Sequence, residues 1–355
     1  MKGILLHGGH GTRLRPLTHT GPKQLLPIAN KPMSEYCIES IKEAGITDIA
    51  IIIGGTGTNK VKEYYADGKN FGVNITYVEQ DEPKGIAHAI RLCKDFVRND
   101  KFLVFLGDNI IQKSVNEYAN NFKNSDAAAS ILLCEVDNPS RFGIADVKDG
   151  RIIKIMEKPK PPPTNLAVTG IYFITPVIFD IIDRLKPSWR NELEITDALE
   201  MLLEEKHKIT YNMITDYWKD TGTPEDIINA NGTILEHMKP YFSGTKDDTV
   251  KMSGNTMIGK ETQIRNNSVI VGPVIIGKNC IIDSARIGPN VSIGDNSNMS
   301  KCEISESIVM SNCNIDSKIK IKNSIIAFNS TIISNNEEGK NHKTFLLGEG
   351  TKVIL

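Results

Sequence analysis

A glycine-rich loop near the start of the chain is the first feature whose residue types could do chemistry. It directly follows the apolar run 3–6, and its members are Gly8, Gly9, Gly11, Thr12 and Arg13. Glycines let backbone N–H groups approach phosphate oxygens without a Cβ clash, and arginine adds a planar fork of donors that suits phosphate. The loop lacks the Gly-Lys-Ser/Thr ending of a Walker A motif, and Leu14 stands where a dinucleotide-binding fingerprint has its third glycine. The loop therefore indicates a phosphate site of another kind.

Two further positions carry side chains that suit phosphate chemistry. Lys23 follows Gly21-Pro22, and Asp108 follows the apolar run 102–106. A lysine offsets the negative charge of reacting phosphates, and a carboxylate at the carboxyl end of a buried strand is well placed for a metal ion. The alternatives are a solvated surface lysine and a loop aspartate that accepts hydrogen bonds from nearby N–H groups.

The elements that must position these residues follow from the first 239 residues, where strand and helix patterns alternate. The helical patterns 34–44 and 86–97 are the clearest. The strand patterns are 49–53, 73–78, 102–106 and 127–136. This order predicts an α/β fold with a mainly parallel, doubly wound sheet, whose ligands bind at the carboxyl ends of the strands. Asp149-Gly150 predicts a hairpin that adds antiparallel strands, so we expect a mixed sheet.

The C-terminal part follows a different period. From Ile258 to Ile332 an apolar residue recurs every six positions, with occasional steps of five. A six-residue repeat is typical of a parallel β-helix, in which six residues build one flat side and three sides build one coil. A β-sandwich would alternate with a period of two instead. We expect a catalytic domain over 1–239, a polar linker without a clear period over 240–254, and a hexapeptide-repeat domain over 255–355.

Composition limits the function classes. The chain has 355 residues and a formal net charge of −1, from 42 Lys plus Arg and 43 Asp plus Glu. This balance argues against a general nucleic-acid binder, and no apolar run approaches the roughly 18 residues that span a bilayer. Six cysteines without a CxxC pair, and the absence of a secretion signal at the N-terminus, predict a cytoplasmic protein with reduced thiols.

A series of motifs gives the chain a family resemblance. In chain order they are GGHGTRLRPLT, GPKQLLPIANKPM, VEQDEPKGIAHAI, FLGDN, RFGIAD, EKPKPPP, NLAVTGIYF, ELEITDAL and YWKDTGTPED. This series resembles the sugar-1-phosphate nucleotidylyltransferases over essentially the whole chain, and within them the long thymidylyltransferases that carry a β-helix tail. The resemblance implies a Rossmann-like mixed sheet followed by a left-handed parallel β-helix. It also implies a reaction of dTTP with glucose 1-phosphate that gives dTDP-glucose and pyrophosphate, with Mg²⁺ as cofactor.

The resemblance also implies roles for individual residues. Arg13 and Lys23 are the implied catalytic cations, and Asp108 and Asp220 the implied magnesium ligands. The implied nucleotide-binding residues are Gly8, Gly9, Gly11, Thr12, Gln80 and Gly85. The implied sugar-phosphate-binding residues are Gly143, Glu157, Lys158, Thr169 and Gly170. We interpret His7 and His10 as packing residues, because in-line attack by a phosphate needs no base.

Three alternatives stay open at this point. UTP could replace dTTP, because burial of the 5-methyl group is worth only about 1 kcal/mol. The β-helix could add acyl transfer to an amino sugar, although His342, the one histidine after residue 250, lies beyond the last clear repeat. The chain could also be a non-catalytic assembly protein, and the intact charged residues of the implied site argue against that.

The tail is expected to organise a homo-oligomer. The flat sides of a β-helix can pack against copies of themselves, and closed rings are the usual arrangement of identical chains. The resemblance favours a trimer. Truncation near Pro240 is then expected to lower the assembly state while it leaves the chemistry of Lys23, Asp108 and Asp220 in place.

Overall fold

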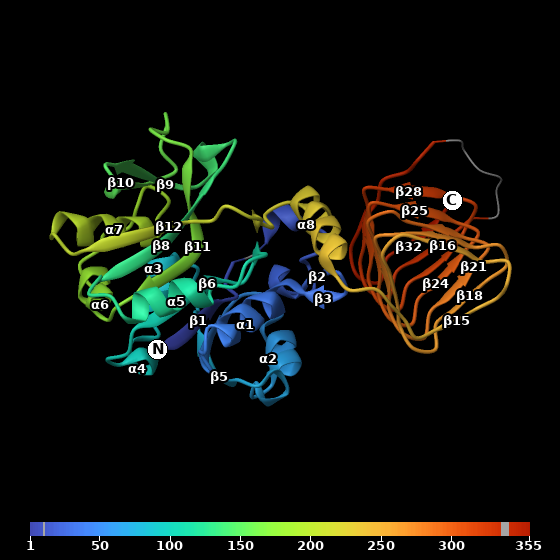
Figure 1. The fold of residues 1–355 in the computed structure, drawn as a ribbon, viewed down its shortest axis with the longest axis horizontal. Helices are drawn as coiled ribbons and strands as arrows, with labels where there is room; N and C mark the ends of the chain where they lie inside the picture. Colours follow the sequence, from blue (N-terminus) through green and yellow to red (C-terminus); the bar gives the residue numbers. More distant parts are fainter. Residues whose placement is uncertain (10, 335–340) are drawn as a thin grey trace. The chain divides into compact units, whose positions relative to one another are not determined.

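The computed structural model describes residues 1–9, 11–334 and 341–355, and its contacts divide the chain into two compact units (Figure 1). The first unit comprises Met1–His10 and Ser34–Asp220. The second comprises Gly11–Met33 and Thr221–Leu355. A segment near the N-terminus therefore belongs with the C-terminal part of the chain, although more than 180 residues separate the two in sequence. His10, interpreted above as a packing residue, lies outside the described residues.

The first unit is built around a nine-stranded sheet, and this sheet is mixed, as the sequence predicts. Its strands are β1 (Lys2–Leu6), β4 (Asp48–Ile53), β5 (Asn74–Glu79), β6 (Phe102–Leu106), β8 (Ala129–Glu135), β9 (Gly143–Lys148), β10 (Arg151–Glu157), β11 (Leu166–Ile174) and β12 (Ile209–Met213). The main path runs β10-β9-β11-β6-β1-β4-β5, and β8 joins β12 to β11. Strands β6, β1, β4 and β5 are parallel, whereas β11 runs antiparallel to β6.

Helices cover this sheet, so its central strands are apolar on both faces. They are α1 (Met33–Glu43), α2 (Thr58–Tyr65), α3 (Ile86–Arg91), α4 (Lys94–Val97), α5 (Asn116–Lys123), α6 (Val177–Ile182) and α7 (Ile195–Glu204). Ile4, Ile52 and Val104 on three neighbouring strands are fully buried. The predicted hairpin joins β9 to β10, and both Asp149 and Gly150 at its turn have positive φ, as a type I′ turn requires. None of the helices in the described part of the chain has the length and apolar character of a membrane span.

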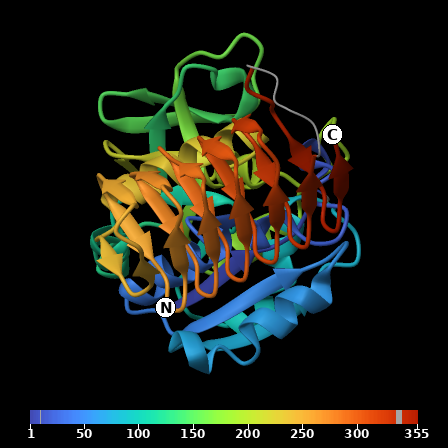
Figure 2. The same cartoon turned by 90° about the vertical axis from the view of Figure 1, so that its right-hand side faces the viewer.

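The second unit contains a left-handed parallel β-helix with three flat sides, and Figure 2 shows its stacked coils. The first side consists of β14 (Tyr241–Phe242), β17 (Thr256–Ile258), β20 (Val274–Ile276), β23 (Val291–Ile293), β26 (Ser307–Val309), β29 (Ile325–Ile326) and β31 (Leu346–Leu347). The second consists of β15 (Thr245–Lys246), β18 (Gln263–Arg265), β21 (Ile281–Asp283), β24 (Asn298–Ser300), β27 (Asn314–Asp316), β30 (Thr331–Ile333) and β32 (Lys352–Ile354). The third consists of β16 (Lys251–Ser253), β19 (Val269–Val271), β22 (Arg286–Ile287), β25 (Glu303–Ser305) and β28 (Lys320–Lys322).

The six-residue repeat produces a dry interior. Ile264, Ile282, Met299 and Ile315 lie in register on the second side, and each is at most 1% exposed. The same holds for Ile270, Ile287, Ile304 and Ile321 on the third side. Each coil therefore buries apolar side chains against the coils above and below it, which is the stacking that repeat proteins depend on.

The stretch 240–254, expected as a linker, contains the first coil of the β-helix. Its strands β14, β15 and β16 pair in parallel with β17, β18 and β19. A terminal coil has a neighbour on one side only, so its residues face solvent more and need no regular apolar pattern. Tyr241 and Phe242 accordingly are both 45% exposed, while Val250 alone in this stretch is a buried apolar residue.

Asparagines form a ladder along one corner of the coils. Asn279, Asn296, Asn312 and Asn329 all have left-handed backbone angles, with φ between 54° and 61°. Each of the first three side-chain amides donates to the Oδ1 of the next asparagine, at 3.1 to 3.2 Å. Asparagine tolerates this backbone region better than most residues, so it satisfies both the corner and the hydrogen bonds.

Asn296→Ala is expected to lower the free energy of unfolding by about 1–2 kcal/mol, because it puts a Cβ residue without a local hydrogen bond into the left-handed region. Asn296→Gly keeps the backbone angle available and is expected to lose less. Urea unfolding of the full-length variants measures both values. Equal stability of the two variants would contradict the role of the left-handed corner.

Candidate active site

The carboxyl ends of β1 and β6 lie side by side and begin the site. Leu6 pairs with Leu106, and the N–H of Gly107 donates to the Leu6 carbonyl at 3.0 Å. His7 and the first glycines of the loop therefore leave the sheet beside Asp108, which is 9% exposed. This is the edge at which parallel sheets bind their ligands, and the sequence analysis expected Asp108 at this edge.

Three of the expected nucleotide-binding residues come together at this edge. A Cβ at position 8 would lie 3.2 Å from Oε1 of Gln80, so Gly8 leaves room beside that amide. The Gln80 side chain is oriented by its own Nε2, which donates to the Gly85 carbonyl at 3.3 Å and contacts Nδ1 of His88 at 2.9 Å. Gly9 has φ 101° and nothing within 4 Å of its Cβ position. The amide of Gln80 is thus held in place next to an open stretch of backbone.

Glycine at position 85 has a structural reason of its own. Its φ is 99°, and a Cβ there would lie 2.4 Å from the Leu193 carbonyl oxygen. Gly54, which sequence reasoning missed, is similar, because its Cβ would lie 2.4 Å from the Gln80 carbonyl oxygen. Both glycines allow backbone segments to pack closely around Gln80. The sequence signal for Gly54 was its place directly after the apolar strand β4.

The two expected magnesium ligands are brought together by a short pair of strands. β7 (Asn109–Ile111) pairs antiparallel with β13 (Trp218–Asp220), and in this register Asp220 lies opposite Asn109. The indole Nε1 of Trp218 donates to Oδ1 of Asn109 at 2.7 Å, and Nδ2 of Asn109 donates to Oδ1 of Asp108 at 3.1 Å. Asn109 therefore ties both segments together, a role that the sequence analysis did not assign.

This arrangement fits a magnesium ion that arrives with phosphates. Magnesium takes one or two carboxylates and completes its shell with phosphate oxygens and water. The described residues contain no cluster of three or more His, Cys, Asp or Glu side chains that could hold a metal alone. A Cβ at position 170 would lie 2.7 Å from Nδ2 of Asn109, so glycine there lets the Asn109 amide pack against the β11 backbone.

A second polar cluster surrounds Glu157 at the end of β10. Its Oε1 lies 3.1 Å from Nζ of Lys158 and 3.4 Å from Nη1 of Arg190, and its Oε2 accepts a hydrogen bond from Thr196 Oγ1 at 3.0 Å. Gly143 pairs with Glu157, and a Cβ there would lie 2.6 Å from Thr196 Cγ2. The structure thus unites three of the expected sugar-phosphate-binding residues, Gly143, Glu157 and Lys158, in a half-buried site.

Arg190 and Glu194 belong to this cluster and were missed from the sequence. Arg190 Nη1 lies 3.2 Å from Glu194, which is 3% exposed, and burial together with the charge of Glu157 raises the pKa of Glu194. Asn191 between them has φ 59°, which asparagine tolerates. Thr169, by contrast, is fully buried and its Oγ1 donates to the Leu132 carbonyl at 3.0 Å, so its hydroxyl serves the sheet.

The remaining expected residues lie in the second unit. Gly11 has φ 57° and directly precedes the 3₁₀ helix Thr12–Leu14, which contains Arg13. The Gly11 carbonyl accepts a hydrogen bond from Thr18 Oγ1 at 2.8 Å, which fixes the turn. Lys23 begins a second 3₁₀ helix, Lys23–Leu25. The segment 11–33 therefore carries Gly11, Thr12, Arg13 and Lys23 on a compact, hydrogen-bonded loop.

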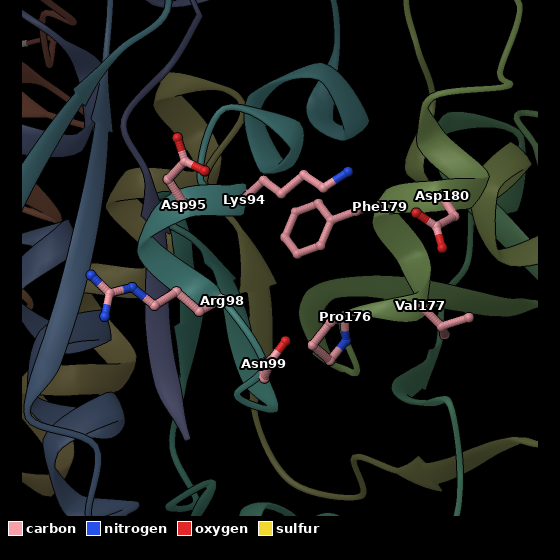
Figure 3. Close-up of a pocket in the computed structure, with 8 residues that line it drawn as sticks. All are labelled: Lys94, Asp95, Arg98, Asn99, Pro176, Val177, Phe179 and Asp180. Atoms are coloured by element: carbon pink, nitrogen blue, oxygen red, sulfur yellow. The ribbon is translucent and has the colours of Figure 1, made fainter.

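A pocket of about 780 Å³ lies elsewhere in the first unit (Figure 3). Its lining residues are Lys94, Asp95, Arg98, Asn99, Pro176, Val177, Phe179 and Asp180. They come from α4 and α6 and the residues beside them, which lie next to Phe102 and Ile174, the pair at the amino end of β6. The pocket is thus at the opposite edge of the sheet from Asp108, and none of the expected site residues lines it.

Comparisons with known proteins show the family to which the chain belongs. The model of the nucleotidyl transferase family matches residues 2–237, so the chain belongs to that family. It is 43% identical to the low-salt glycan biosynthesis nucleotidyltransferase Agl11 of Haloferax volcanii, over 85% of this chain and 95% of that protein. It is 40% identical to the glucose-1-phosphate thymidylyltransferase of Streptomyces antibioticus, over 100% of this chain and 99% of that protein.

A solved structure is similar in the same way. A Bacillus anthracis protein provisionally assigned as a glucose-1-phosphate thymidylyltransferase is 44% identical and superposes with a TM-score of 0.63. The match covers 66% of this chain and 94% of that one. These similarities support a sugar-1-phosphate nucleotidyltransferase. The names of the relatives differ, so they do not identify one pair of substrates.

His7 makes the stability of the fold depend on pH. It is 1% exposed, packs edge-on against Tyr65 at 5.9 Å between ring centroids, and neither ring nitrogen has a hydrogen-bond partner among the described residues. Burial lowers its pKa to about 3, against the partial opposition of the Asp108 charge. The imidazole is therefore neutral at pH 7, as a packing residue would be.

The unfolded chain takes up a proton on His7 near pH 6.5, while the folded chain does so only near pH 3. Between these values the imidazole contributes a loss of about 1.4 kcal/mol of stability for each unit that the pH falls. His7→Asn is therefore expected to flatten the decline of the free energy of unfolding between pH 6.5 and pH 4, measured by urea unfolding. His237→Asn, at an exposed position, is the control and should keep the wild-type slope. Parallel slopes for wild type and His7→Asn would contradict the burial argument.

Proposed function

We propose that this chain transfers a thymidylyl group from dTTP to glucose 1-phosphate and releases pyrophosphate. The observation that carries the proposal is the β7–β13 pair, which brings Asp220 opposite Asn109 and so beside Asp108, at the sheet edge where Gly8 and Gln80 also lie. A carboxylate pair next to an open glycine backbone suits a nucleoside triphosphate with its magnesium ion. The cluster around Glu157 offers a separate site for a hydroxylated, phosphorylated partner.

The reaction needs no acid or base from the protein. A phosphate oxygen of the sugar 1-phosphate attacks the α-phosphorus in line, the new P–O bond forms, and the bond from the α-phosphorus to the bridging oxygen breaks with pyrophosphate as leaving group. The difficulty is electrostatic, because two anions must meet and charge builds on the equatorial oxygens. Arg13 and Lys23 are the cations that we assign to this task. The magnesium ion held by Asp108 and Asp220 would supply further neutralisation of the phosphate charge.

Gln80 is our candidate for the residue that reads the base. An amide donates and accepts at once, as the edge of a pyrimidine requires, and both Gly85 and His88 fix its orientation. The relative from Streptomyces antibioticus, similar over the full length, supports dTTP. UTP is the second candidate, because the two bases present the same hydrogen-bonding edge and differ by one methyl group.

Glu157 and Lys158 are our candidates for the sugar phosphate. The carboxylate can accept hydrogen bonds from sugar hydroxyls, and the ammonium group can pair with the phosphate. In the structure the carboxylate of Glu157 pairs with both Lys158 and Arg190. A substrate that brings both hydroxyls and a phosphate would replace these ion pairs group for group.

The tail supports assembly better than a second chemistry in this proposal. His342 is exposed and lies on the stretch that leads to the last coil. We infer a homo-oligomer, with a trimer favoured. The polar second and third sides of the β-helix are its available flat surfaces, since they carry ion pairs such as Arg265 with Asp283 at 2.8 Å.

Substrate choice is tested with a matrix of dTTP, UTP, ATP and GTP against the 1-phosphates of glucose, galactose, glucosamine and N-acetylglucosamine. Pyrophosphate release is expected to be fastest, by kcat/KM, for dTTP with glucose 1-phosphate. UTP is expected to be lower by about five- to tenfold, because one buried methyl group is worth about 1 kcal/mol or slightly more. A preference for UTP would support the second candidate. No release with any pair would contradict the proposed reaction.

Lys23→Ala is expected to lower kcat by about 100-fold or more while the fold is kept, because a positioned charge that stabilises the transition state is worth several kcal/mol. Steady-state pyrophosphate release measures kcat, and thermal unfolding checks the fold. Lys246→Ala, at an exposed position of β15, is the matched control and should keep normal turnover. A folded Lys23→Ala variant with near-normal kcat would remove this lysine from the mechanism.

A further inference from the structure

One side of the β-helix is unlike the other two. On the side that contains β23, the outward-pointing residue of each central strand is buried, at 0% to 6% exposed. We call this row the docking row; its members, in register, are Met257, Ile275, Ser292, Ile308 and Ile325. The outward residues of the second side include the charged Arg265 and Asp316, which are exposed. Part of the same unit must therefore cover the docking row.

Helix α8 (Pro224–His237) provides part of the cover. It contacts β23, β26 and the short strand β2 (Pro27–Ile28). Leu235 is fully buried in one cluster with Met257, Ile275 and Ala29, against which Ile234 and Met238 also pack. Ala29 belongs to the segment 11–33, which carries Arg13 and Lys23 and which we call the catalytic segment. This segment and the β-helix tail therefore share one apolar cluster.

The tip of a hairpin in the catalytic segment docks beside this cluster. β2 pairs with β3 (Lys31–Pro32), and the residues between them, Ala29 and Asn30, both have positive φ (47° and 63°), as a type I′ turn requires. The Ala29 N–H donates to Oδ1 of Asn231 on α8 at 2.9 Å, and that oxygen lies 2.6 Å from the hydroxyl of Ser292. Nδ2 of Asn30 donates to the Ile293 carbonyl at 2.7 Å.

These bonds are specific and buried. Asn231 and Ser292 are each 0% exposed, and Ser292 is the one polar member of the docking row. A buried hydroxyl without a partner is costly, so an isoleucine would cover the row better if packing were its only task. The Ser292 hydroxyl binds Oδ1 of Asn231, which also accepts from the Ala29 N–H. These bonds therefore define one position for the hairpin tip.

The other end of the catalytic segment also meets the tail. A Cβ at Gly348, directly after β31, would lie 3.2 Å from the Pro16 carbonyl oxygen and 3.3 Å from its Cβ. Pro16 follows Arg13 by three residues, and Lys23 precedes β2 by four. The tail therefore contacts this segment at Pro16 and at Ala29-Asn30, on either side of Lys23 in the chain.

We propose that the β-helix is a positioning element for catalysis, and that the docking of the Ala29-Asn30 tip onto β23 and α8 fixes the place of Lys23. The proposal rests on the function proposed above for Lys23. It makes Asn30, Asn231 and Ser292 positioning residues, which touch no substrate. It also changes the expectation for truncation near Pro240, because loss of the tail removes the surface on which the catalytic segment is ordered.

The test compares full-length variants. Asn30→Gly removes the bond to Ile293 and keeps the positive φ, and Ser292→Ala removes the hydroxyl at Asn231. Each is expected to lower kcat by about tenfold, because a displacement of about 1 Å can cost up to about 100-fold in turnover. The KM for either substrate is expected to change by less than about twofold. The matched controls are Asn296→Gly, at a left-handed corner of the asparagine ladder, and Ser297→Ala, a buried serine whose Oγ accepts from the Cys313 N–H at 3.2 Å. The controls should lower the melting temperature to a similar degree and keep wild-type kcat.

A double-mutant cycle separates this inference from the proposed function. In a Lys23→Ala background, Asn30→Gly and Ser292→Ala are expected to cost less than about twofold in kcat, because they act through the absent lysine. Wild-type kcat in the two docking variants, or an equal loss in both backgrounds, would overturn the positioning role while Lys23→Ala remains impaired. A folded Lys23→Ala variant with normal turnover would instead overturn the assignment of Lys23 and, with it, this use of the docking contact.

Discussion

The parallel pairing of β1 with its neighbours β6 and β4 is the constraint on which the rest of the first unit depends. Parallel strands end at one edge, so the residues that follow them must emerge together. His7 and the first glycines follow β1, Asp108 follows β6, and the glycine after β4 lets the backbone of Gln80 come close. The short β7–β13 pair then adds Asp220. Backbone pairing alone thus brings the residues that follow these strands to one edge of the sheet, whatever their side chains are.

The second unit also depends on parallel pairing, which there encloses an apolar interior. Three flat sides close around an apolar interior, and left-handed corner residues turn the chain at each edge. Two of the sides are polar outside. The first side is apolar outside, where α8 and the segment 11–33 cover it. The β-helix is therefore more than an appended domain in this chain, since its first side shares an apolar cluster with the segment that carries Arg13 and Lys23.

Patterns of short period were readable in the sequence, and contacts between distant segments were not. The six-residue recurrence of isoleucine predicted the β-helix because each coil repeats the same local burial. The sequence analysis did not predict the first coil, over 240–254, because a terminal coil buries too few apolar residues to show a period. The bonds from Ala29 to Asn231 and from Asn30 to Ile293 join residues 202 and 263 positions apart, and no local pattern encodes them. Family motifs supplied Glu157, but its contacts with Arg190 and Thr196 came only with the fold.

The bond from Asn30 to Ile293 also has a consequence for synthesis on the ribosome. At about 5–20 residues per second, an emerging chain needs roughly 13–53 s to add the 263 residues that separate the two partners. During that time the hairpin tip has been made and its binding surface has not. The central sheet can form from residues already translated, whereas the segment with Arg13 and Lys23 stays without its final partners until the fourth strand of the first side, β23, has emerged. Activity is then gained late in translation, close to the completion of the chain.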